Sequence, residues 1–274
     1  MIKKVAAIHD LSGIGRCSLT VAIPILSALK VQCCPFPTAI LSSQTGYPKY
    51  SFFDLTSQMD DYKNTWAELN IDFDCIYSGF LGSIDQIDIV CNFINNNKNS
   101  LIITDPVMGD NGCLYPIFND EMCKKIRNLV KKSDIVTPNL TEALILIDKD
   151  FTDINLCKDE LISIAKKVSD LGPNKVIITG IILDGKIHNL AFDKDLNEVH
   201  FTTSNFNNIS YSGTGDIFTS IVTGLLLNGY SLSYSVDKAS EFIHKVVLYT
   251  SKLSSDRNDG VLFELFLNEL ISYV

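Results

Sequence analysis

The stretch "NISYSGTGDIFTSIVTGLLL", residues 208–227, decides the fold. In it Gly213 and Gly215 bracket Thr214. Asp216 follows at once, and apolar residues then recur at helical spacing. One interpretation is an ordinary helix start, capped by the serine at 212 or by Thr214, with an acid in its first turn. The other is that backbone N–H groups bind an anion here, with Asp216 beside it as a base.

The rest of the chain alternates short apolar runs with amphipathic ones, as parallel strands joined by helices do. The strands are expected at 4–9, 75–80, 101–106, 134–139 and 175–180. The helices are expected at 18–29, 83–96, 119–132, 141–147, 157–171, 215–228, 233–250 and 262–273. Residues 176–193 read as two strands joined by an Asp184-Gly185 turn, which predicts an antiparallel edge. We expect one α/β domain over residues 1–274, with a mostly parallel central sheet and helices on both faces.

Composition excludes several classes of partner and of site. The net charge of −9 over 274 residues argues against nucleic acid or an anionic membrane surface as the main partner. Neither a secretory signal nor an apolar run long enough to span a bilayer is evident, so a cytoplasmic location is expected. The eight cysteines contain no C-x-x-C pair. They are interpreted as small buried hydrophobic residues rather than metal ligands.

Oxygen-bearing residues and glycines follow four of the expected strands. Asp105 ends one strand, Thr137 ends the next, Thr179 and Gly180 end a third, and His9 and Asp10 end the first. In an open parallel sheet, ligands bind beyond the carboxyl ends of the strands. The four strand ends therefore predict a binding site at one edge of the sheet.

Three other patterns are weaker. "GIGRCS", residues 13–18, lacks the third glycine of a dinucleotide fingerprint and the acid expected about 20 residues further on. "GIILDGKI", residues 180–187, has Ile187 where a phosphate-binding loop needs Ser or Thr. His9 lacks a nucleophile and an orienting partner that the sequence can identify, so a structural or merely polar role is favoured over that of a base.

The motifs "SGTGD", "TPNLTEA", "DPVMGDNG" and "PTAILSSQTGY" occur in the order found in ribokinase-like vitamin kinases. The chain most resembles the pyridoxal/pyridoxamine (vitamin B6) kinases, over about residues 4–260. The resemblance implies a ribokinase-like three-layer α/β/α fold and transfer of the ATP γ-phosphoryl group to the 5′-hydroxymethyl group of a B6 vitamer. It also implies a homodimer.

The resemblance assigns roles to the phosphate side of the site. Asp216 would accept the hydroxyl proton, while the N–H groups of Gly213, Thr214 and Gly215 hold the migrating phosphoryl group. Glu142 would hold Mg²⁺ through water, although Asn139 and Glu142 also fit a capping box. The remaining residues expected around ATP, Mg²⁺ or a monovalent cation such as K⁺ are Asp105, Asp110, Thr137, Asn139, Thr179 and Gly180. Residues 108–116 are expected to be either a mobile flap over ATP or a plain loop.

For the vitamin, the resemblance implies a second group of residues: Asp10, Ser12, Gln44, Thr45, Tyr47 and Phe80. Pyridoxal kinases often carry Ser at the position of Asp10, His at that of Gln44 and Tyr at that of Phe80. Asp10 and Gln44 are more similar to the hydroxymethylpyrimidine kinases of thiamine biosynthesis.

Three hypotheses follow: a B6 vitamer kinase, a hydroxymethylpyrimidine (phosphate) kinase, and a non-catalytic vitamin-binding protein. The "HDLSGIGRCSLT" and "PTAILSSQTG" contexts favour the B6 vitamer kinase over the pyrimidine kinase. The combination of Asp216, Glu142 and Asp105 argues against a carrier, which has no need of a base beside an anion site.

Overall fold

A nine-stranded sheet runs through the centre of the computed structural model, which describes residues 2–153, 156–205, 209–253 and 256–274. The strand order is β11-β10-β9-β8-β5-β4-β1-β2-β3. Their bounds are β1 (Lys4–Ser12), β2 (Gln32–Leu41), β3 (Phe52–Asp54), β4 (Cys75–Ser78), β5 (Leu101–Thr104), β8 (Ile135–Val136), β9 (Lys175–Leu183), β10 (Lys186–Asp193) and β11 (Glu198–Asn205). The strands from β9 to β2 are parallel, whereas β10, β11 and β3 are antiparallel to their neighbours. The predicted fold class is confirmed.

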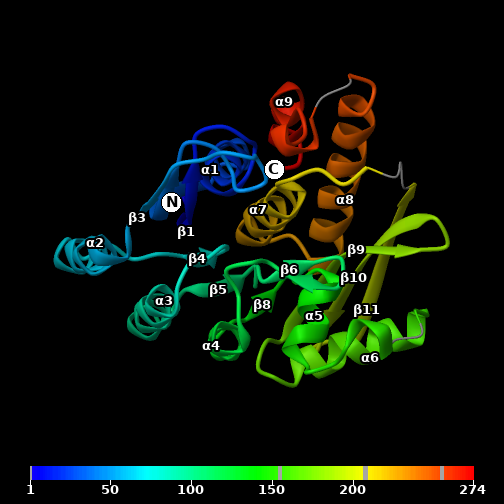
Figure 1. The fold of residues 1–274 in the computed structure, drawn as a ribbon, viewed down its shortest axis with the longest axis horizontal. Coiled ribbons are helices and arrows are strands. Elements are labelled where there is room, and N and C mark those ends of the chain that lie inside the picture. Colours follow the sequence, from blue (N-terminus) through cyan, green and yellow to red (C-terminus); the bar gives the residue numbers. More distant parts are fainter. Residues whose placement is uncertain (1, 154–155, 206–208, 254–255) are drawn as a thin grey trace.

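Helices cover both faces of this sheet, as Figure 1 shows. One layer comprises α1 (Ser18–Ala28), α7 (Thr214–Leu227), α8 (Leu232–Thr250) and α9 (Leu267–Ile271). The other comprises α2 (Thr56–Glu68), α3 (Ile84–Asn96), α4 (Asp120–Val130), α5 (Leu140–Leu146) and α6 (Lys158–Ser169). Short 3₁₀ turns lie at η1 (Phe151–Asp153), η2 (Arg257–Asp259) and η3 (Phe263–Phe266), so the expected final helix is divided between η3 and α9.

The central strands are apolar at consecutive positions because each face of the sheet has its own core. In β1, Val5 and Ala7 pack into the core under α1 and α7, while Ala6 and Ile8 pack into the core on the other face. All four side chains are fully buried. Successive side chains of a strand point to opposite faces of the sheet, so alternate residues of β1 pack into different cores.

Strand β2 was not expected from the sequence, because Pro35 and Pro37 argue against a strand. It pairs with β1 along one side, but with β3 on its other side only over Ala39–Leu41. The carbonyl of Pro35 accepts a hydrogen bond from Tyr62 on this second side. Two prolines two residues apart turn their nitrogens to the same side, where no strand pairs with them.

Other elements were missed for simpler reasons. Helix α2 carries mostly polar residues and fully buries only Met59, so it lacks a strong apolar stripe. Strands β3 and β11 lie at the two edges of the sheet, where none of their side chains is buried. The predicted hairpin is confirmed: Asp184 and Gly185 both have positive φ, as a tight turn between β9 and β10 requires.

The cysteines differ in part from expectation. All eight are free thiols, but only Cys75, Cys91 and Cys123 are buried, whereas Cys113 and Cys157 are exposed. Exposure follows position, since Cys113 lies in a hairpin and Cys157 directly precedes α6. Among the described residues, no helix is both long and apolar enough to cross a bilayer.

We predict that Gly224→Ala lowers the free energy of unfolding by about 1–3 kcal/mol. A methyl group on Gly224 of α7 would lie 2.5 Å from Cδ1 and 2.9 Å from Cβ of Leu29, a fully buried residue at the end of α1. Urea denaturation would measure the loss. The exposed α3 variant Asn92→Ala is the control and should change stability by less than about 0.5 kcal/mol. Equal stability of Gly224→Ala and the wild type would contradict this packing.

Candidate functional site

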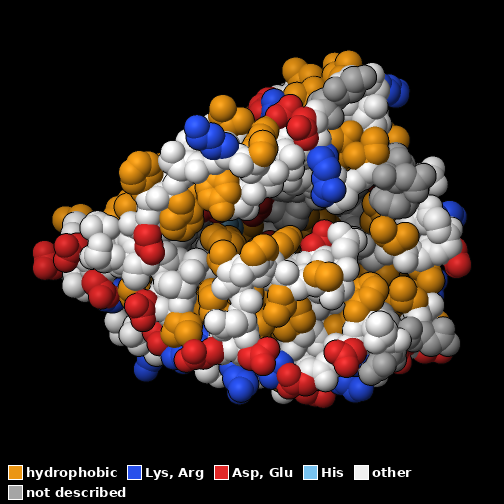
Figure 2. All heavy atoms as spheres, viewed as in Figure 1, with side chains coloured by type: hydrophobic (Ala, Val, Ile, Leu, Met, Phe, Trp, Pro, Cys, Tyr) orange, Lys and Arg blue, Asp and Glu red, His pale blue; other side chains and the backbone are white. Residues whose placement is uncertain are grey.

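A cavity of about 390 Å³ opens where β5, β8 and β9 end, beside the first turn of α7. The space-filling view in Figure 2 shows a hollow near the middle of the face viewed, with carboxylate side chains at its rim. The residues predicted for the anion and for ATP all line this cavity: Asp105, Asp110, Thr137, Asn139, Glu142, Thr179, Gly180, Gly213, Thr214, Gly215 and Asp216. The structure thus brings them together, and their individual roles remain predictions.

The start of α7 leaves backbone N–H groups available to a ligand. Gly213 is the N-cap, with φ of 76°, and no side chain caps the helix. The Thr214 hydroxyl donates instead to the carbonyl of Tyr211, so the expected side-chain cap is wrong, while the expected acid in the first turn, Asp216, is present. The first N–H groups of a helix have no intrahelical acceptor, and the helix dipole adds positive potential there. This first turn suits an anion.

Asp216 stands at the edge of that turn, with its side chain 16% exposed. Its Oδ2 accepts a hydrogen bond of 2.9 Å from the backbone N–H of Ser18, and the Ser18 hydroxyl donates to Oδ1 of Asp10 at 2.5 Å. Burial raises the pKa of Asp216 to about 7, the Ser18 N–H acts to lower it, and the nearby Asp10 acts to raise it further. The carboxylate is therefore poised to gain or lose a proton near neutral pH.

Glu142 and Asp105 are buried carboxylates that face the same cavity. Glu142 forms a complete capping box with Asn139 at the start of α5, and its other oxygen accepts from the backbone N–H of Met108. Burial raises the pKa of Glu142 to about 8, against these N–H donors. Burial, and then the charges of Glu142 and Asp216, raise the pKa of Asp105 well above its usual range. The cavity therefore favours a cation that would offset these charges.

The donor set fits Mg²⁺, which prefers oxygen ligands and commonly keeps several waters. In the described part of the chain, no three His, Cys, Asp or Glu side chains are grouped closely enough to hold a metal ion by themselves. Mg²⁺ would accordingly need phosphate oxygens and water besides Glu142 and Asp105. Thr137 and Thr179 also supply oxygens to the cavity lining, and Thr137 already accepts a hydrogen bond from Thr219.

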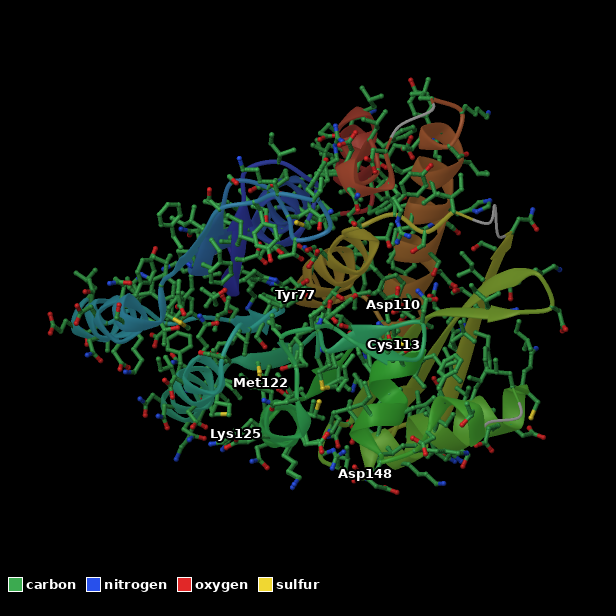
Figure 3. The ribbon with its side chains drawn as sticks, viewed as in Figure 1. Tyr77, Asp110, Cys113, Met122, Lys125 and Asp148 are labelled. Carbon is green, nitrogen blue, oxygen red and sulfur yellow. The ribbon has the colours of Figure 1, made fainter. Side chains whose placement is uncertain are left out.

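Residues 108–116 form a small hairpin at the mouth of the cavity, made of β6 (Gly109–Asp110) and β7 (Cys113–Leu114). Figure 3 labels Asp110 and Cys113 at the two sides of this hairpin. Asp110 lines the cavity, and Asn139 donates to the carbonyl of Gly109, which ties the hairpin to α5. The plain-loop alternative is wrong, while closure of the hairpin over ATP stays a prediction.

The residues predicted around the vitamin lie outside this cavity lining. Both oxygens of Asp10 are engaged, by the hydroxyls of Ser12 and Ser18. Gln44 donates to the carbonyl of Asn258. Thr45 is exposed, Tyr47 donates to Asp259, and Phe80 packs edge-on against Phe118 at 6.2 Å. The side chains predicted to bind the vitamin thus contact different neighbours and do not line one common cavity with the ATP residues.

The η2 segment lies beside the site, and the sequence motifs did not reveal it. Its Asp259 carbonyl accepts from the Arg16 N–H and its Arg257 carbonyl accepts from the Ser212 N–H, directly before the cap of α7. Arg257 is also the single Lys or Arg among the described residues that line the cavity. Only its neighbourhood in space identifies it, since nothing in "SDRNDG" is distinctive.

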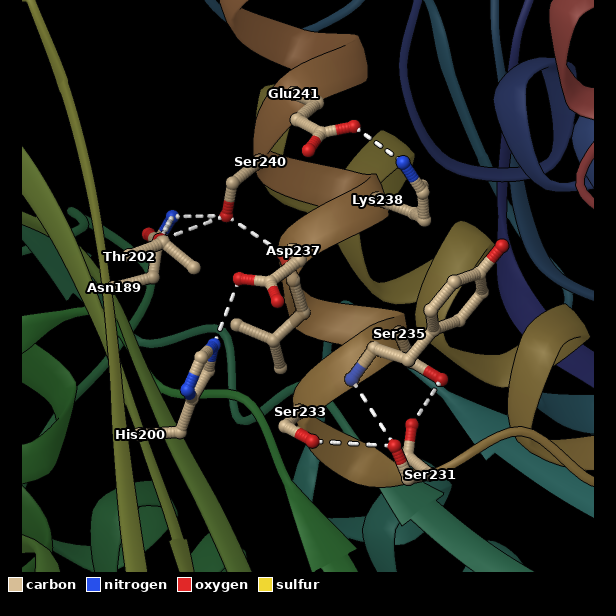
Figure 4. Close-up of polar contacts among 12 residues, drawn as sticks. Asn189, His200, Thr202, Ser231, Ser233, Ser235, Asp237, Lys238, Ser240 and Glu241 are labelled. Atoms are coloured by element: carbon tan, nitrogen blue, oxygen red, sulfur yellow. Dashed lines mark hydrogen bonds and ion pairs between the residues drawn. The ribbon is translucent and has the colours of Figure 1, made fainter.

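A polar network on the far wall of the cavity was also missed. Figure 4 shows Asn189 of β10 and Thr202 of β11 meeting Ser240 of α8. Asn189 Oδ1 accepts from the N–H of Gly180, which has φ of 65° inside β9. Below it, His200 pairs with Asp237 at 2.7 Å. The network thus links Gly180, which lines the cavity, to β10, β11 and α8.

The "GIGRCS" turn serves the protein's own backbone. Gly13 and Ile14 bond to the carbonyls of Leu41 and Ser42, and the carbonyl of Arg16 packs against Gly213. A side chain at position 213 would overlap that carbonyl. The turn at residues 13–18 therefore lies against the start of α7, and the glycine there makes this contact possible. His9 lies behind Asp216, fully buried.

Comparison with known proteins gives consistent matches. The family model described as phosphomethylpyrimidine kinase matches residues 23–260. A Bacteroides thetaiotaomicron structure, described as a candidate phosphomethylpyrimidine kinase and crystallised with pyridoxal, is 44% identical, has a TM-score of 0.94 and covers 98% of this chain and 96% of its own. Pyridoxal kinase from Lactobacillus plantarum is 25% identical, with a TM-score of 0.91 and coverage of 99% and 98%. Pyridoxine kinase of Bacillus subtilis is 32% identical over 63% of each chain.

We predict that Gly213→Ala abolishes ATP binding and destabilises the protein, because the added methyl group would displace the Arg16 carbonyl and move the start of α7. Gly229→Ala is a matched control: its φ of 88° is equally unfavourable for Ala, but a methyl group there meets no atom within 4 Å. Calorimetric titration with ATP and thermal unfolding would compare the two. ATP binding by Gly213→Ala equal to that by Gly229→Ala would show that the position of this turn does not matter.

Proposed function

This chain belongs to the phosphomethylpyrimidine kinase family, and we propose that the substrate of this ATP-dependent kinase is a B6 vitamer (pyridoxal, pyridoxine or pyridoxamine). The observation that carries the proposal is that a structure 44% identical to this chain was crystallised with pyridoxal. The product would be pyridoxal 5′-phosphate or its pyridoxine or pyridoxamine analogue, as in vitamin salvage.

The reaction follows from the charges at the start of α7. The 5′-hydroxyl oxygen attacks the γ-phosphorus, a new P–O bond forms, and the bond to the bridging β–γ oxygen breaks to release ADP. Asp216 takes the hydroxyl proton. The N–H groups of Gly213, Thr214 and Gly215 hold the equatorial oxygens through the transfer, where developing charge needs fixed donors.

The buried acids would hold the cations. Glu142, with Asp105 and Asp110, is proposed to bind Mg²⁺, which neutralises phosphate charge when bound. Asp105, Thr137 and Thr179 are proposed to surround either triphosphate oxygens or K⁺, with Asn139 and Gly180 nearby. Arg257 adds a positive side chain, the single Lys or Arg among the described lining residues.

The vitamin ring is proposed to bind near Asp10, Ser12, Gln44, Thr45, Tyr47 and Phe80. Asp10 is linked to the base through Ser18, which supports a ring site close to Asp216. A homodimer and a cytoplasmic location complete the proposal. Phe53 is 64% exposed and Ile40 is 43% exposed at the β3 edge, which supports a surface that a second copy could cover.

A hydroxymethylpyrimidine (phosphate) kinase is the second candidate. Asp10 and Gln44 favour it, as does the description of the matching family. The match to a family of kinases argues against the third hypothesis, a non-catalytic vitamin-binding protein.

We predict that pyridoxal, pyridoxine or pyridoxamine gives more phosphorylated product than hydroxymethylpyrimidine when each is supplied with Mg-ATP. Product would be measured by mass spectrometry and the release of ADP by a coupled assay. Heat-inactivated protein controls for chemical hydrolysis. A value of kcat/KM that is higher for the pyrimidine would transfer the assignment to the second candidate.

We predict that Asp216→Asn lowers kcat by about 10²–10⁴-fold, the contribution of a placed general base. The KM for ATP should stay within about threefold, because the N–H groups of the turn are unchanged. Steady-state kinetics would measure both. Asp88→Asn on α3, which loses an exposed ion pair with Lys125 of α4, is the matched control and should keep wild-type rates. A mutant rate within a few fold of wild type would remove Asp216 from the mechanism.

A further inference from the structure

A buried imidazole lies directly behind the proposed base. His9 of β1 is 0% exposed, and within the described residues neither ring nitrogen has a hydrogen-bond partner. Leaving polar atoms unpaired in a protein interior costs free energy, so such a group in a native fold calls for an explanation.

The surroundings of His9 fix the direction of its ring. Gly79 packs against the Nδ1 edge so closely that a methyl group there would overlap it. The ring of Tyr77, labelled in Figure 3, meets the imidazole edge-on at a centroid distance of 4.3 Å. Nδ1 is thereby held 4.0 Å from Oδ1 of Asp216. A shift of about 1 Å would bring these two atoms to hydrogen-bond distance.

The protonation state of His9 limits what it can do. Burial lowers the pKa of His9 to about 3, so the ring is neutral and carries one N–H. It therefore offers Asp216 a hydrogen-bond donor rather than a positive charge. Hydrogen bonds of catalytic groups are often long without substrate and shorten in the reacting complex.

We propose that His9 is a positioning residue whose Nδ1–H donates to Oδ1 of Asp216 when substrate is bound, while the Ser18 N–H holds Oδ2. The two donors would then fix the carboxylate plane from behind and leave a lone pair free toward the substrate hydroxyl. This inference rests on the proposed role of Asp216 as the base.

The donor would matter because burial and the neighbouring Asp10 both disfavour the charged form of Asp216, while the Ser18 N–H opposes them. Asp105 after β5, Cys17 before α1 and Tyr77 of β4 also lie within electrostatic reach of Asp216, and none of them is a cation. A hydrogen bond to the ionised carboxylate lowers its pKa. His9 would thus keep more of the base ionised at neutral pH.

The test compares His9→Asn with His9→Gln. The Asn amide nitrogen can occupy the position of Nδ1, whereas that of Gln reaches the position of Nε2. We expect His9→Asn to keep kcat within about threefold and to leave the acid limb of the kcat–pH profile where the wild type has it. His9→Gln and His9→Leu should lose about tenfold in kcat and move that limb upward by about one unit, with little change in the KM for ATP.

Tyr77→Phe is the matched control, because it alters the same buried contact but removes no donor to Asp216. It should shift the melting temperature without moving the pH profile. Equal kcat and equal acid limbs for His9→Asn and His9→Gln would overturn the proposal.

A second experiment uses the unmodified protein with pyridoxal and a non-hydrolysable ATP analogue. There ¹⁵N NMR must show the Nδ1–H tautomer of His9, and an Nε2–H tautomer would overturn the proposal without any variant. Loss of activity in Asp216→Asn beside normal His9 variants would reject only this inference.

Discussion

The close packing of the Arg16 carbonyl against Gly213 is the contact on which the site depends. It fixes the start of α7, and with it the N–H groups that face the cavity. Gly260 permits the same crowding from the other side, since its φ is 74° and a methyl group there would lie 2.8 Å from Cβ of Arg16. Three stretches distant in sequence thus meet without side chains between them, and backbone donors are held where flexible side chains could not hold them.

Around this rigid turn the protein buries more negative charge than it neutralises. Asp105, Glu142 and Asp216 all have raised pKa values for the same first reason, loss of water, and neighbouring carboxylates add to the effect at each of them. Such an arrangement weakens the empty fold, because each carboxylate that ionises does so without hydration. It suits a site whose ligands bring Mg²⁺ and a triphosphate together, since cation and anion then replace the missing solvent.

The sequence predicted those parts of the molecule that local rules govern. Parallel strands deliver their ends to one edge, so Asp105, Thr137 and Thr179 could be placed in one site from their order alone. Ser18 and Arg257 could not, because their contacts depend on how loops pack across the sheet. Strand β2 was hidden because its prolines are tolerated only where a neighbouring strand is missing, and that is a property of the sheet rather than of the segment.

Those prolines also affect how the molecule behaves among its own copies. An open sheet edge is a template on which another chain can add a strand, and aggregation often begins in this way. Over residues 32–38 that template is defective, since Pro35 and Pro37 offer no N–H to an incoming backbone. Two copies that meet along this edge must therefore recognise each other through side chains, which favours a defined pairing over an endless ladder.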